Sequence, residues 1–596
     1  MKNTLVDLFF QGVNSYNNPK LLNYKAGESA WMSTSSAQAA DKVRHLALGF
    51  HQYGIQPGDR IALLSENRPE WILSDLALLS LGAVTVPIYT TQSLPQIEFI
   101  LSFSDLKAVL ISSGHFYERI LPLLKQLNFA SKVITFDKIQ FSHDIPPLKE
   151  IEANGKNVEK ENPNLYESLR AKISPDQLAT IIYTSSETGE AKGVMLSHGN
   201  IASNVLASAK LFDFNRKNDV ALSYLPLSHI FERATLYHYL YRQIAVYFVE
   251  SIERMPDYLM DVRPTLITTV PRFLEKAYER LLSRRERMGR VTRKIFDWGL
   301  ALAKGYQENR KFSPWKKFSY LLADQLVYAR WRARFGGRFR FMICGGAKLR
   351  PEIAKIYTAA GIPLLQGYGL TETSPVIAVN ALRKNRIGSV GQVLGGVKVK
   401  IAADGEILVS GPNVTRGYYK NEAATKAVFE GEWFKTGDLG YLDSDGYLYV
   451  TERKKDLIKT SGGKFIAPQA IERLFKLSPY VADVVVIGDE RKFATALIFP
   501  DFDQLKSYAK KEKIHVKDEQ LLNHASVKML YEKIVHDVNK QLAHWETIKK
   551  YSVIPEVVTL PSTSEAISPK VKRKTLQEKY RAIVEALYHE KNVGLE

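Results

Sequence analysis

The chain has very little cysteine and no long apolar run. Its 596 residues contain one cysteine, Cys344, which excludes an internal disulfide bond and any metal site built only of cysteines. No run of roughly 18 apolar residues occurs, and the start, MKNTLVDLFFQGVN, has only a short apolar patch, so we expect neither a signal peptide nor a membrane span. The common phosphate-binding pattern GxxxxGK[ST] is also missing, which excludes an ordinary P-loop. These absences predict a cytoplasmic chain.

Acidic residues are too few to balance the basic ones, and the net charge is +19. The excess is concentrated in residues 280–340, where 17 Lys or Arg face 4 Asp or Glu, a net charge of +13. Aromatic and aliphatic residues are interleaved with this charge, which is typical of basic amphipathic helices at the inner, anionic face of a membrane. A solvated helical face is the simpler alternative. We expect no nucleic acid partner, because no nucleic-acid motif accompanies the charge.

The patterning of residues 40–110 alternates between helix-like and strand-like segments, such as DRIALLS followed by WILSDLALLSLG. This is the rhythm of βαβ layers, and it predicts an α/β fold with sheets flanked by helices. Residues 154–164, which include GKNVEKENPN, are polar and predict a loop. A chain of this length also predicts at least two domains.

The character of the sequence changes between residues 395 and 450, where Asp404-Gly405 and Asp445-Gly446 predict the turns of antiparallel hairpins. A smaller α/β segment follows the polar stretch ERKKD. We therefore expect an N-terminal domain over residues 1–453 and a C-terminal α+β domain over residues 454–596.

The most informative motif is a polar loop, TSSETGEAKG, that follows the apolar run LATII. A buried strand would deliver such a loop to the surface. Its small residues let the backbone approach an anion, its hydroxyl groups donate hydrogen bonds, and its lysine adds positive charge. The predicted phosphate-binding residues are Thr184, Ser185, Ser186, Thr188, Gly189 and Lys192.

This loop resembles the phosphate loop of the adenylate-forming enzymes, TSGTTGxPKG, and four further segments match that superfamily in order and spacing. They are QGYGLTETS (366–374), WFKTGDLG (433–440), KKDLIKTSGGK (454–464) and SPKVKRK (568–574). Together they cover nearly the whole chain and resemble the long-chain fatty acid–CoA ligases in particular. The resemblance implies a large adenylation domain of several subdomains, with a β-rich part, and a small mobile C-terminal domain.

Residues 366–374 place a glycine-flanked tyrosine, whose flat face suits a purine, just before a threonine and a carboxylate. A carboxylate close to phosphates needs a cation between them, and Mg²⁺ binds through one or two carboxylates plus phosphate oxygens. The resemblance implies that Thr371 contacts the α-phosphate and that Glu372 holds Mg²⁺. A helix N-cap at Thr371 is the alternative. The adenine-binding residues that the resemblance implies are Gly346, Ala347, Tyr368 and Gly369.

The remaining site residues also come from the resemblance. Asp438 and Arg453 would bind the ribose, although a turn-capping aspartate and a surface ion pair are the alternatives. Lys455 would be the hinge, and Gly462 and Gly463 would line the path of the CoA arm; an ordinary flexible turn is the alternative.

The resemblance implies that one mobile lysine of the C-terminal segment reaches the reacting phosphate. The alignment gives Lys570 for this role, with Lys572 as the alternative. A basic solvated strand end is the simplest explanation of the segment. His229, in the segment LPLSHIFER, would lie near the carboxylate that is activated. A structural histidine is the alternative at that position.

The loop departs from the family pattern at three positions, because Ser186 replaces a glycine, Glu187 replaces a hydroxyl residue and Ala191 replaces a proline, which is a mild change. A carboxylate there would repel phosphates unless it turned away or bound a metal ion. Glu187 could therefore face solvent in a working enzyme, help to bind Mg²⁺, or mark the loss of ATP use.

The resemblance implies a ligase that uses ATP and Mg²⁺ to convert a fatty acid into an acyl-adenylate and transfers the acyl group to coenzyme A. One alternative is a ligase that loads a carrier protein, and another is a non-catalytic acyl-binding protein. No local pattern encodes the acyl chain length or the oligomeric state.

Overall fold

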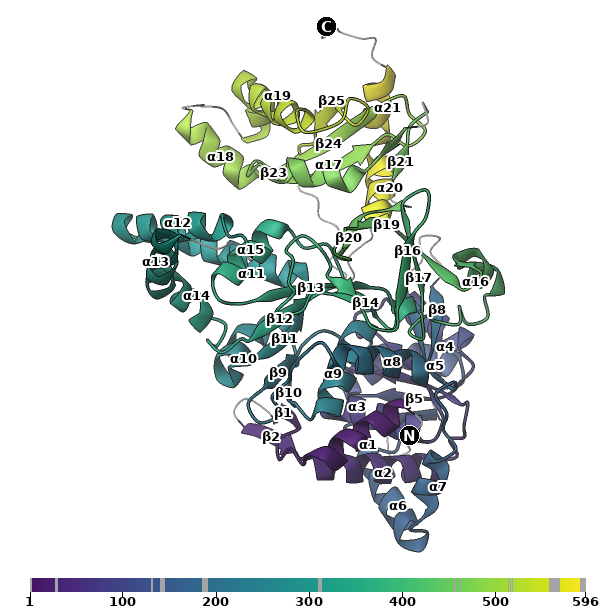
Figure 1. The fold of residues 1–596 in the computed structure, drawn as a ribbon. Coiled ribbons are helices and arrows are strands. Elements are labelled where there is room, and N and C mark those ends of the chain that lie inside the picture. Colours follow the sequence, from purple (N-terminus) through teal and green to yellow (C-terminus); the bar gives the residue numbers. More distant parts are fainter. Residues whose placement is uncertain are drawn as a thin grey trace. The chain divides into compact units, whose positions relative to one another are not determined.

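The computed structural model describes residues 3–26, 30–129, 132–139, 145–184, 191–308, 313–454, 457–461, 464–512, 514, 516, 518–556 and 569–589. The chain divides into two compact units (Figure 1). The larger unit contains the described residues up to Thr436 together with Tyr441–Tyr449. The smaller unit contains Gly437–Gly440 and the described residues from Val450 onward.

The first sheet of the larger unit has six strands in the order β6-β5-β3-β4-β7-β8. Its strands are β3 (Arg60–Leu64), β4 (Val84–Ile88), β5 (Leu106–Ile111), β6 (Val133–Thr135), β7 (Leu178–Thr184) and β8 (Lys192–Ser197). All pair in parallel except β8, which returns antiparallel to β7. The expected alternation is confirmed here, since DRIALLS contains β3 and most of the next segment belongs to α3 (Pro69–Ser80).

The second sheet has nine strands in the order β15-β14-β13-β12-β11-β9-β10-β1-β2. Its parallel centre consists of β1 (Leu22–Ala26), β9 (Val220–Ser223), β10 (Ala245–Phe248), β11 (Leu266–Thr269), β12 (Phe341–Cys344) and β13 (Leu364–Gly369). Antiparallel strands close both edges, namely β2 (Ala30–Thr34), β14 (Val376–Val379) and β15 (Gln392–Val393). Parallel strands joined by helices are the expected α/β pattern.

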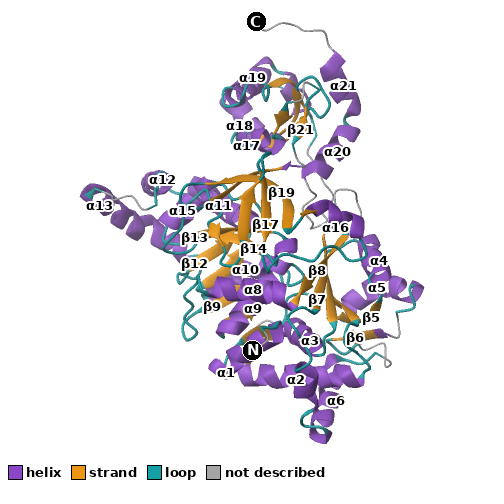
Figure 2. Cartoon of the chain, turned by 45° about the vertical axis from the view of Figure 1, so that its right-hand side comes forward, coloured by secondary structure: helices purple, strands orange, loops and turns teal. Residues whose placement is uncertain are grey.

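Helices α8 (His198–Ala209) and α9 (Ile230–Arg242) lie between these two sheets (Figures 1 and 2). Their apolar side chains join one core with residues from β7, β8 and β9. The other helices of the larger unit are α1 (Leu5–Ser15), α2 (Ser36–Gln52), α4 (Leu94–Phe103), α5 (Gly114–Gln126), α6 (Leu148–Glu161), α7 (Leu165–Arg170), α10 (Met255–Val262), α11 (Pro271–Glu286), α12 (Arg290–Lys304), α13 (Pro314–Ala323), α14 (Ala329–Ala333), α15 (Pro351–Ala359) and α16 (Glu422–Val428).

The loop predicted at residues 154–164 is wrong, because most of it belongs to α6. This helix buries Leu148, Ile151 and Gly155 against α2. A side chain at Gly155 would stand 1.7 Å from the main-chain oxygen of His45, so the glycine permits the close approach of two helices rather than a turn. Lys156, Lys160 and Glu161 form the solvated face of the helix, whereas Glu159 pairs with Arg44 and His45 of α2.

The predicted hairpins are confirmed. Strands β16 (Lys398–Ile401) and β17 (Glu406–Ser410) flank Gly405, and β19 (Trp433–Leu442) and β20 (Leu448–Arg453) flank Gly446. Both glycines have a positive φ, of 86° and 76°, which a tight turn requires. With β18 (Phe429–Glu430), these strands form a five-stranded sheet.

The smaller unit contains the three-stranded sheet β23-β24-β25 and the pair β21-β22. The strands are β21 (Ile458–Lys459), β22 (Phe465–Ile466), β23 (Val481–Ile487), β24 (Ala494–Pro500) and β25 (Ile548–Val553). The helices are α17 (Pro468–Phe475), α18 (Phe502–Lys511), α19 (Ala525–Asn539), α20 (Pro569–Lys579) and α21 (Arg581–His589).

Candidate active site

Two of the predicted phosphate-binding residues, Thr184 and Lys192, lie at the facing ends of strands β7 and β8. Thr184 and Lys192 are register partners, and the Thr184 hydroxyl donates to the main-chain oxygen of Lys192 at 3.4 Å. The hairpin therefore brings the two ends of the loop together, as a compact anion-binding turn requires. The other predicted loop residues lie outside the described residues; they are Ser185, Ser186, Thr188 and Gly189, together with Glu187.

Most of the other predicted residues of the larger unit lie beyond the carboxyl ends of parallel strands in the nine-stranded sheet. His229 follows β9, Gly346 and Ala347 follow β12, and Tyr368 and Gly369 end β13. Open parallel sheets bind ligands at this edge. The structure thus brings to one edge three segments that are separate in the sequence.

Glycine is required at two of these positions. Gly346 has a φ of 77°, in the region that favours glycine. At Gly369 a side chain would stand 1.7 Å from the main-chain oxygen of Pro375, so only glycine allows the chain to fold back on itself here. The backbone next to Tyr368 is therefore determined by close packing.

Glu372 lies in a short 3₁₀ turn, Thr371–Thr373, directly after β13. Its carboxylate accepts a hydrogen bond of 2.9 Å from the hydroxyl of Tyr418. The ammonium of Lys192 lies over the ring of the same tyrosine, 5.2 Å from its centroid. The loop lysine and the proposed metal-binding carboxylate, 180 positions apart in the chain, therefore meet on one side chain.

Three asparagines hold this turn and the segment before Tyr418 in place. The amide of Asn413 donates to the main-chain oxygen of Thr373 at 2.8 Å, and that of Asn204 donates to Val376 at 2.7 Å. Asn200, on the same helix as Asn204, donates to the main-chain oxygens of Pro412 and Val414 at 2.7 and 2.9 Å. Helix α8 thus fastens the turn and the segment before Tyr418 to one rigid element.

The donor set around Glu372 suits a metal ion that arrives with a nucleotide. Among the described residues, no group of three or more His, Cys, Asp and Glu side chains could hold a metal ion by itself. Mg²⁺ commonly binds through one or two carboxylates while phosphate oxygens and water complete its shell. Glu372 provides one such carboxylate, so the residues fit Mg²⁺ bound together with ATP.

His229 is the N-cap of α9, and its Nδ1 accepts a hydrogen bond of 3.1 Å from the backbone N–H of Phe231. The side chain is accessible to solvent, yet desolvation by the surrounding protein lowers its pKa. The imidazole is therefore neutral near pH 7. One turn further along, burial raises the pKa of Glu232 to about 8, so this carboxyl group is largely protonated at neutral pH.

A fully buried ion pair joins α9 to α3, and further hydrogen bonds of its arginine reach the strand that precedes the phosphate loop. The guanidinium of Arg233 donates to Asp75 of α3 at 2.5 and 3.2 Å. It also donates to the hydroxyls of Thr85 on β4 and Thr180 on β7, both at 2.8 Å. The network, which Tyr237 completes by donating to Asp75, ties the helix that carries His229 to β7.

In the smaller unit, Asp438 and Arg453 form an ion pair of 3.2 Å. The aspartate side chain is buried, whereas the arginine side chain is 61% exposed. The two residues expected to bind a ribose are thus neighbours on strands β19 and β20. The pairing is compatible with a ribose site and also with the structural ion pair named as the alternative.

Several predicted residues of the smaller unit cannot be placed. Lys455, Gly462 and Gly463 lie outside the described residues. The backbone of Lys570 belongs to the first turn of α20, and its side chain lies outside what the structure describes.

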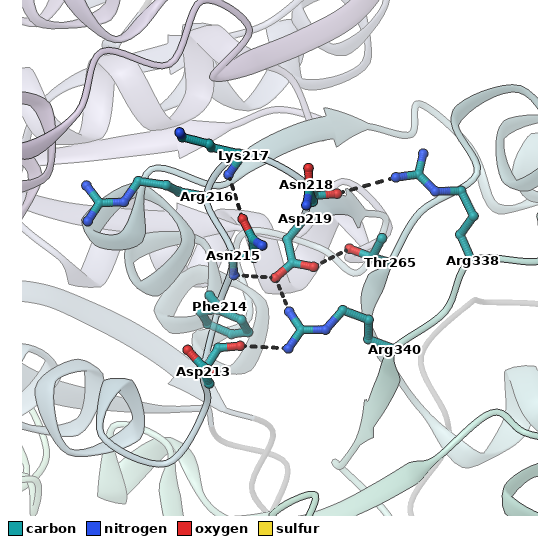
Figure 3. Close-up of a pocket in the computed structure, with 10 residues that line it drawn as sticks. All are labelled: Asp213, Phe214, Asn215, Arg216, Lys217, Asn218, Asp219, Thr265, Arg338 and Arg340. Atoms are coloured by element: carbon teal, nitrogen blue, oxygen red, sulfur yellow. Dashed lines mark hydrogen bonds and ion pairs between the residues drawn. The ribbon is translucent and has the colours of Figure 1, made fainter.

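A separate cavity of about 610 Å³ opens at the opposite, amino-terminal edge of the nine-stranded sheet (Figure 3). Residues 213–219, Thr265, Arg338 and Arg340 line it. The buried carboxylate of Asp219 accepts hydrogen bonds from the backbone N–H of Asn215 at 2.7 Å, from the Thr265 hydroxyl at 3.0 Å and from Arg340. These contacts fasten the loop before β9 to its neighbours, and none of the predicted site residues lies there.

The sequence reasoning missed Tyr418 and the three asparagines. Tyr418 lies 46 positions after Glu372, in the stretch TRGYYK, which has no spacing that marks a site. Asparagines that hold turns through main-chain oxygens have no local signature either, because their partners come from distant segments. Only the tertiary structure reveals these residues.

Comparisons with known proteins agree with the motifs. Residues 14–419 match the AMP-binding enzyme family, and residues 455–592 match the AMP-binding enzyme C-terminal domain. The long-chain-fatty-acid–CoA ligase FadD15 of Mycobacterium bovis is 32% identical over 94% of this chain and 93% of its own length. Fatty acyl-CoA synthetase A of Dictyostelium discoideum is 30% identical over 96% of this chain and 87% of its own length.

Solved structures share the fold. ATP-bound MatB of Rhodopseudomonas palustris superimposes with a TM-score of 0.69 at 24% identity, covering 96% of this chain and 99% of its own. A fatty acyl-CoA synthetase of Mycobacterium tuberculosis gives a TM-score of 0.61 at 23% identity, covering 98% and 99%. The predicted α/β fold is confirmed, and the chain belongs to the family of AMP-binding enzymes that includes the long-chain fatty acid–CoA ligases.

Proposed function

We propose that the protein is an ATP-dependent long-chain fatty acid–CoA ligase. The observation that carries this proposal is the meeting of Lys192 and Glu372 on Tyr418, which places a cation of the phosphate loop and a carboxylate suited to Mg²⁺ in one site. The substrate class rests on the relatives, which are long-chain fatty acid–CoA ligases that match most of the chain.

In the first reaction, a carboxylate oxygen of the fatty acid attacks the α-phosphorus of ATP. A new P–O bond forms the acyl-adenylate, and the bond to pyrophosphate breaks. Both partners are anionic, so positive groups must offset the charge that develops at phosphorus. Lys192 and Lys570 would supply such charge, and Thr184 and Thr371 would donate hydrogen bonds to phosphate oxygens. Mg²⁺ bound with ATP at Glu372 would neutralise phosphate charge.

In the second reaction, the thiol of coenzyme A attacks the acyl carbon and loses its proton. A C–S bond forms, the C–O bond between the acyl carbon and the phosphate breaks, and AMP leaves with that oxygen. The two reactions need different groups around one intermediate, which a rotating small domain can supply. We propose that residues 1–453 bind ATP and the acyl group and that residues 454–596 form the mobile domain. The separate family matches, over residues 14–419 and 455–592, support this division. The two compact units divide slightly earlier, since Gly437–Gly440 and the described residues from Val450 onward belong to the smaller unit. Lys455 would act as the hinge, and Gly462 and Gly463 would line the path of CoA.

Nucleotide recognition would use residues from several segments of the chain. In this proposal Tyr368 stacks on adenine against the backbone of Gly346, Ala347 and Gly369. Asp438 accepts hydrogen bonds from the ribose hydroxyls, and Arg453 orients that carboxylate through the 3.2 Å ion pair. His229, which is neutral at the carboxyl edge of the sheet, would lie near the fatty carboxylate without adding a charge.

Acid-dependent exchange between ATP and labelled pyrophosphate tests the first reaction. The native chain should exchange with palmitate, and Lys570→Ala should lower the rate on the order of 10²–10³-fold. Lys572→Ala is the matched control and should keep the native rate. Collapse in Lys572→Ala instead would move the role to that lysine.

Product formation that requires free coenzyme A would separate this function from the loading of a carrier protein. Absence of exchange in the native chain, with exchange restored by Glu187→Thr, would show that the altered loop has disabled the reaction and that the protein binds acyl ligands without activating them.

We further propose that the protein acts in the cytoplasm and binds the inner membrane surface through the basic segment 280–340. Helix α13 and the π-helical turn Asp324–Tyr328 that continues it expose a stripe of apolar side chains, namely Trp315, Phe318, Leu321, Leu322 and Leu326. Trp315, Leu321 and Phe318 are 82%, 66% and 60% exposed. No helix among the described residues is long and apolar enough to cross a membrane.

This stripe lies opposite a face that is already buried. Ala323, Val327 and Trp331 pack into a core with residues of α12 and α15. A merely solvated helix would carry polar side chains on its outer face, whereas this one carries large apolar ones within a segment of net charge +13. Apolar side chains surrounded by basic ones are complementary to the interface of an anionic bilayer.

Sedimentation with lipid vesicles tests this surface. The native chain should bind vesicles that contain phosphatidylglycerol at least about tenfold more tightly than vesicles of phosphatidylcholine alone. The triple variant Trp315→Ser, Phe318→Ser, Leu321→Ser should lose this binding. A control variant changes two exposed apolar residues elsewhere, Leu477→Ser and Met529→Ser, and should bind normally. Equal binding by both variants would reject the surface.

A further inference from the structure

We propose that Tyr418 is a positioning residue that sets the carboxylate of Glu372 and the ammonium of Lys192 for binding of Mg²⁺ and ATP; this inference rests on the proposed function. Its hydroxyl donates to Glu372 at 2.9 Å, and its ring lies beneath Lys192 at 5.2 Å. One side chain therefore contacts both charged groups, through two different interactions.

The backbone of Tyr418 is fixed from two directions. It pairs with Val194 of β8 in an antiparallel bridge, and the N–H of the next residue, Tyr419, donates to Gly193 at 2.7 Å. From the other side, the N–H of Tyr418 donates to the hydroxyl of Thr425 at 2.9 Å. The tyrosine is only 6% exposed, so its ring has little freedom to move. It is thus attached directly to the strand that starts with Lys192.

Glu372 is attached to the same segment twice. Its main-chain oxygen accepts from the N–H of Thr415 at 2.7 Å, and its side chain accepts from Tyr418. Thr415 in turn donates through its hydroxyl to the main-chain oxygen of Met195 on β8 at 2.6 Å. The segment 415–418 therefore joins the turn that carries Glu372 to the strand that leaves the phosphate loop.

The chemistry of the hydrogen bond suits this role. The phenol O–H of Tyr418 donates to one oxygen of the Glu372 carboxylate at 2.9 Å. A donor on one carboxylate oxygen fixes the plane of the carboxylate and leaves the second oxygen to act as a metal ligand. Metal-binding carboxylates are commonly oriented by such partners. The ring face, in turn, attracts the ammonium of Lys192.

Tyr418→Phe is the direct test, because it removes one oxygen atom and keeps the ring beneath Lys192. Tyr419→Phe is the matched control, since the adjacent tyrosine also donates to a carboxylate at 2.9 Å, that of Asp105, away from Glu372. Binding of ATP is measured by titration calorimetry without fatty acid, once with excess Mg²⁺ and once with EDTA. Thermal unfolding of both variants is recorded alongside.

We expect Tyr418→Phe to weaken ATP binding by roughly 10- to 100-fold in Mg²⁺, the range of a hydrogen bond to a charged group, and to change it little in EDTA. Tyr419→Phe should match the native chain in both conditions. If Tyr418→Phe weakens ATP binding equally in Mg²⁺ and in EDTA, the residue has only a general structural role. If ATP binding does not weaken at all, the residue serves only core packing. Either result overturns the inference.

A second comparison tests whether Tyr418 acts through Glu372. Glu372→Gln should itself lose the Mg²⁺-dependent part of ATP binding, and adding Tyr418→Phe should cost nothing more in that part. Losses that add would contradict the coupling. Failure of the native chain to bind ATP or to exchange pyrophosphate would overturn the proposed function, whereas native exchange with an unchanged Tyr418→Phe overturns only this inference.

Discussion

Asp75→Asn should destabilise the larger unit by about 3–5 kcal/mol, the usual cost of removing one partner from a buried ion pair. The side chains of Asp75 and Arg233 are both 0% exposed. The substitution keeps the shape of the side chain but leaves a guanidinium without its counter-charge. The hydroxyls of Thr85 and Thr180, each 2.8 Å from the guanidinium, cannot replace that charge.

Arg233→Met should destabilise the protein by a similar amount, because it leaves the carboxylate buried and unpaired. The double variant removes both charges, so its loss should fall short of the sum of the single losses by about 1–3 kcal/mol. Urea unfolding followed by circular dichroism measures all three variants.

Asp176→Asn provides the control. Asp176 also pairs with an arginine, Arg416, at 2.7 Å, but their side chains are 87% and 60% exposed. An exposed pair contributes at most about 1 kcal/mol, so this variant should unfold almost as the native chain does. If Asp75→Asn costs no more than Asp176→Asn, or if the two buried substitutions simply add, the reasoning about burial is refuted.

Three further predictions follow from single contacts. Gly369→Ala should lower ATP–pyrophosphate exchange by at least about tenfold, because its methyl group would stand 1.7 Å from the oxygen of Pro375; a native rate would mean that the turn relaxes. Asp438→Ala should raise the KM for ATP by roughly 10- to 100-fold in the same assay, and an unchanged KM would reject the ribose contact. Glu232 should make stability depend on pH. Burial raises its pKa from 4.5 to about 8, so its contribution is full below about pH 4.5 and is lost as the pH rises through about 8. Glu232→Gln should not lose stability in this way when the pH rises. The urea unfolding midpoints of the native chain and the variant measure this, and midpoints that change in parallel with pH would contradict the prediction.

Much of the fold could be predicted from local patterns. The strand DRIALLS, the helix that follows it and both hairpins appear where the alternation of apolar residues and the Asp-Gly turns place them. Such elements depend on the chemistry of neighbouring residues, because backbone preference and the period of apolar side chains act over a few positions. Helix α6 was missed because the polar run around Gly155 has the composition of a loop. The reason for this glycine is a contact with His45, more than 100 positions away.

The candidate site divides in the same way. Glu372, Lys192 and Asp438 could be named from their motifs, since each motif is a continuous stretch whose residue types suit one part of the nucleotide. The residues that orient them could not be named. Tyr418, Asn204 and Asn413 act through hydrogen bonds to segments that lie between 37 and 172 positions away.

The sequence by itself determined the chemical class of this protein, because the order of its five motifs and the absence of a P-loop are properties of the linear chain. Only the tertiary structure decided how the groups are held, since packing brings β8, the turn Thr371–Thr373 and the segment 415–418 together. The physical reason is the range of the forces involved. Turn formation and amphipathic patterning act between near neighbours, whereas a hydrogen bond such as that of Tyr418 to Glu372 forms only after the core has placed distant segments within 3 Å.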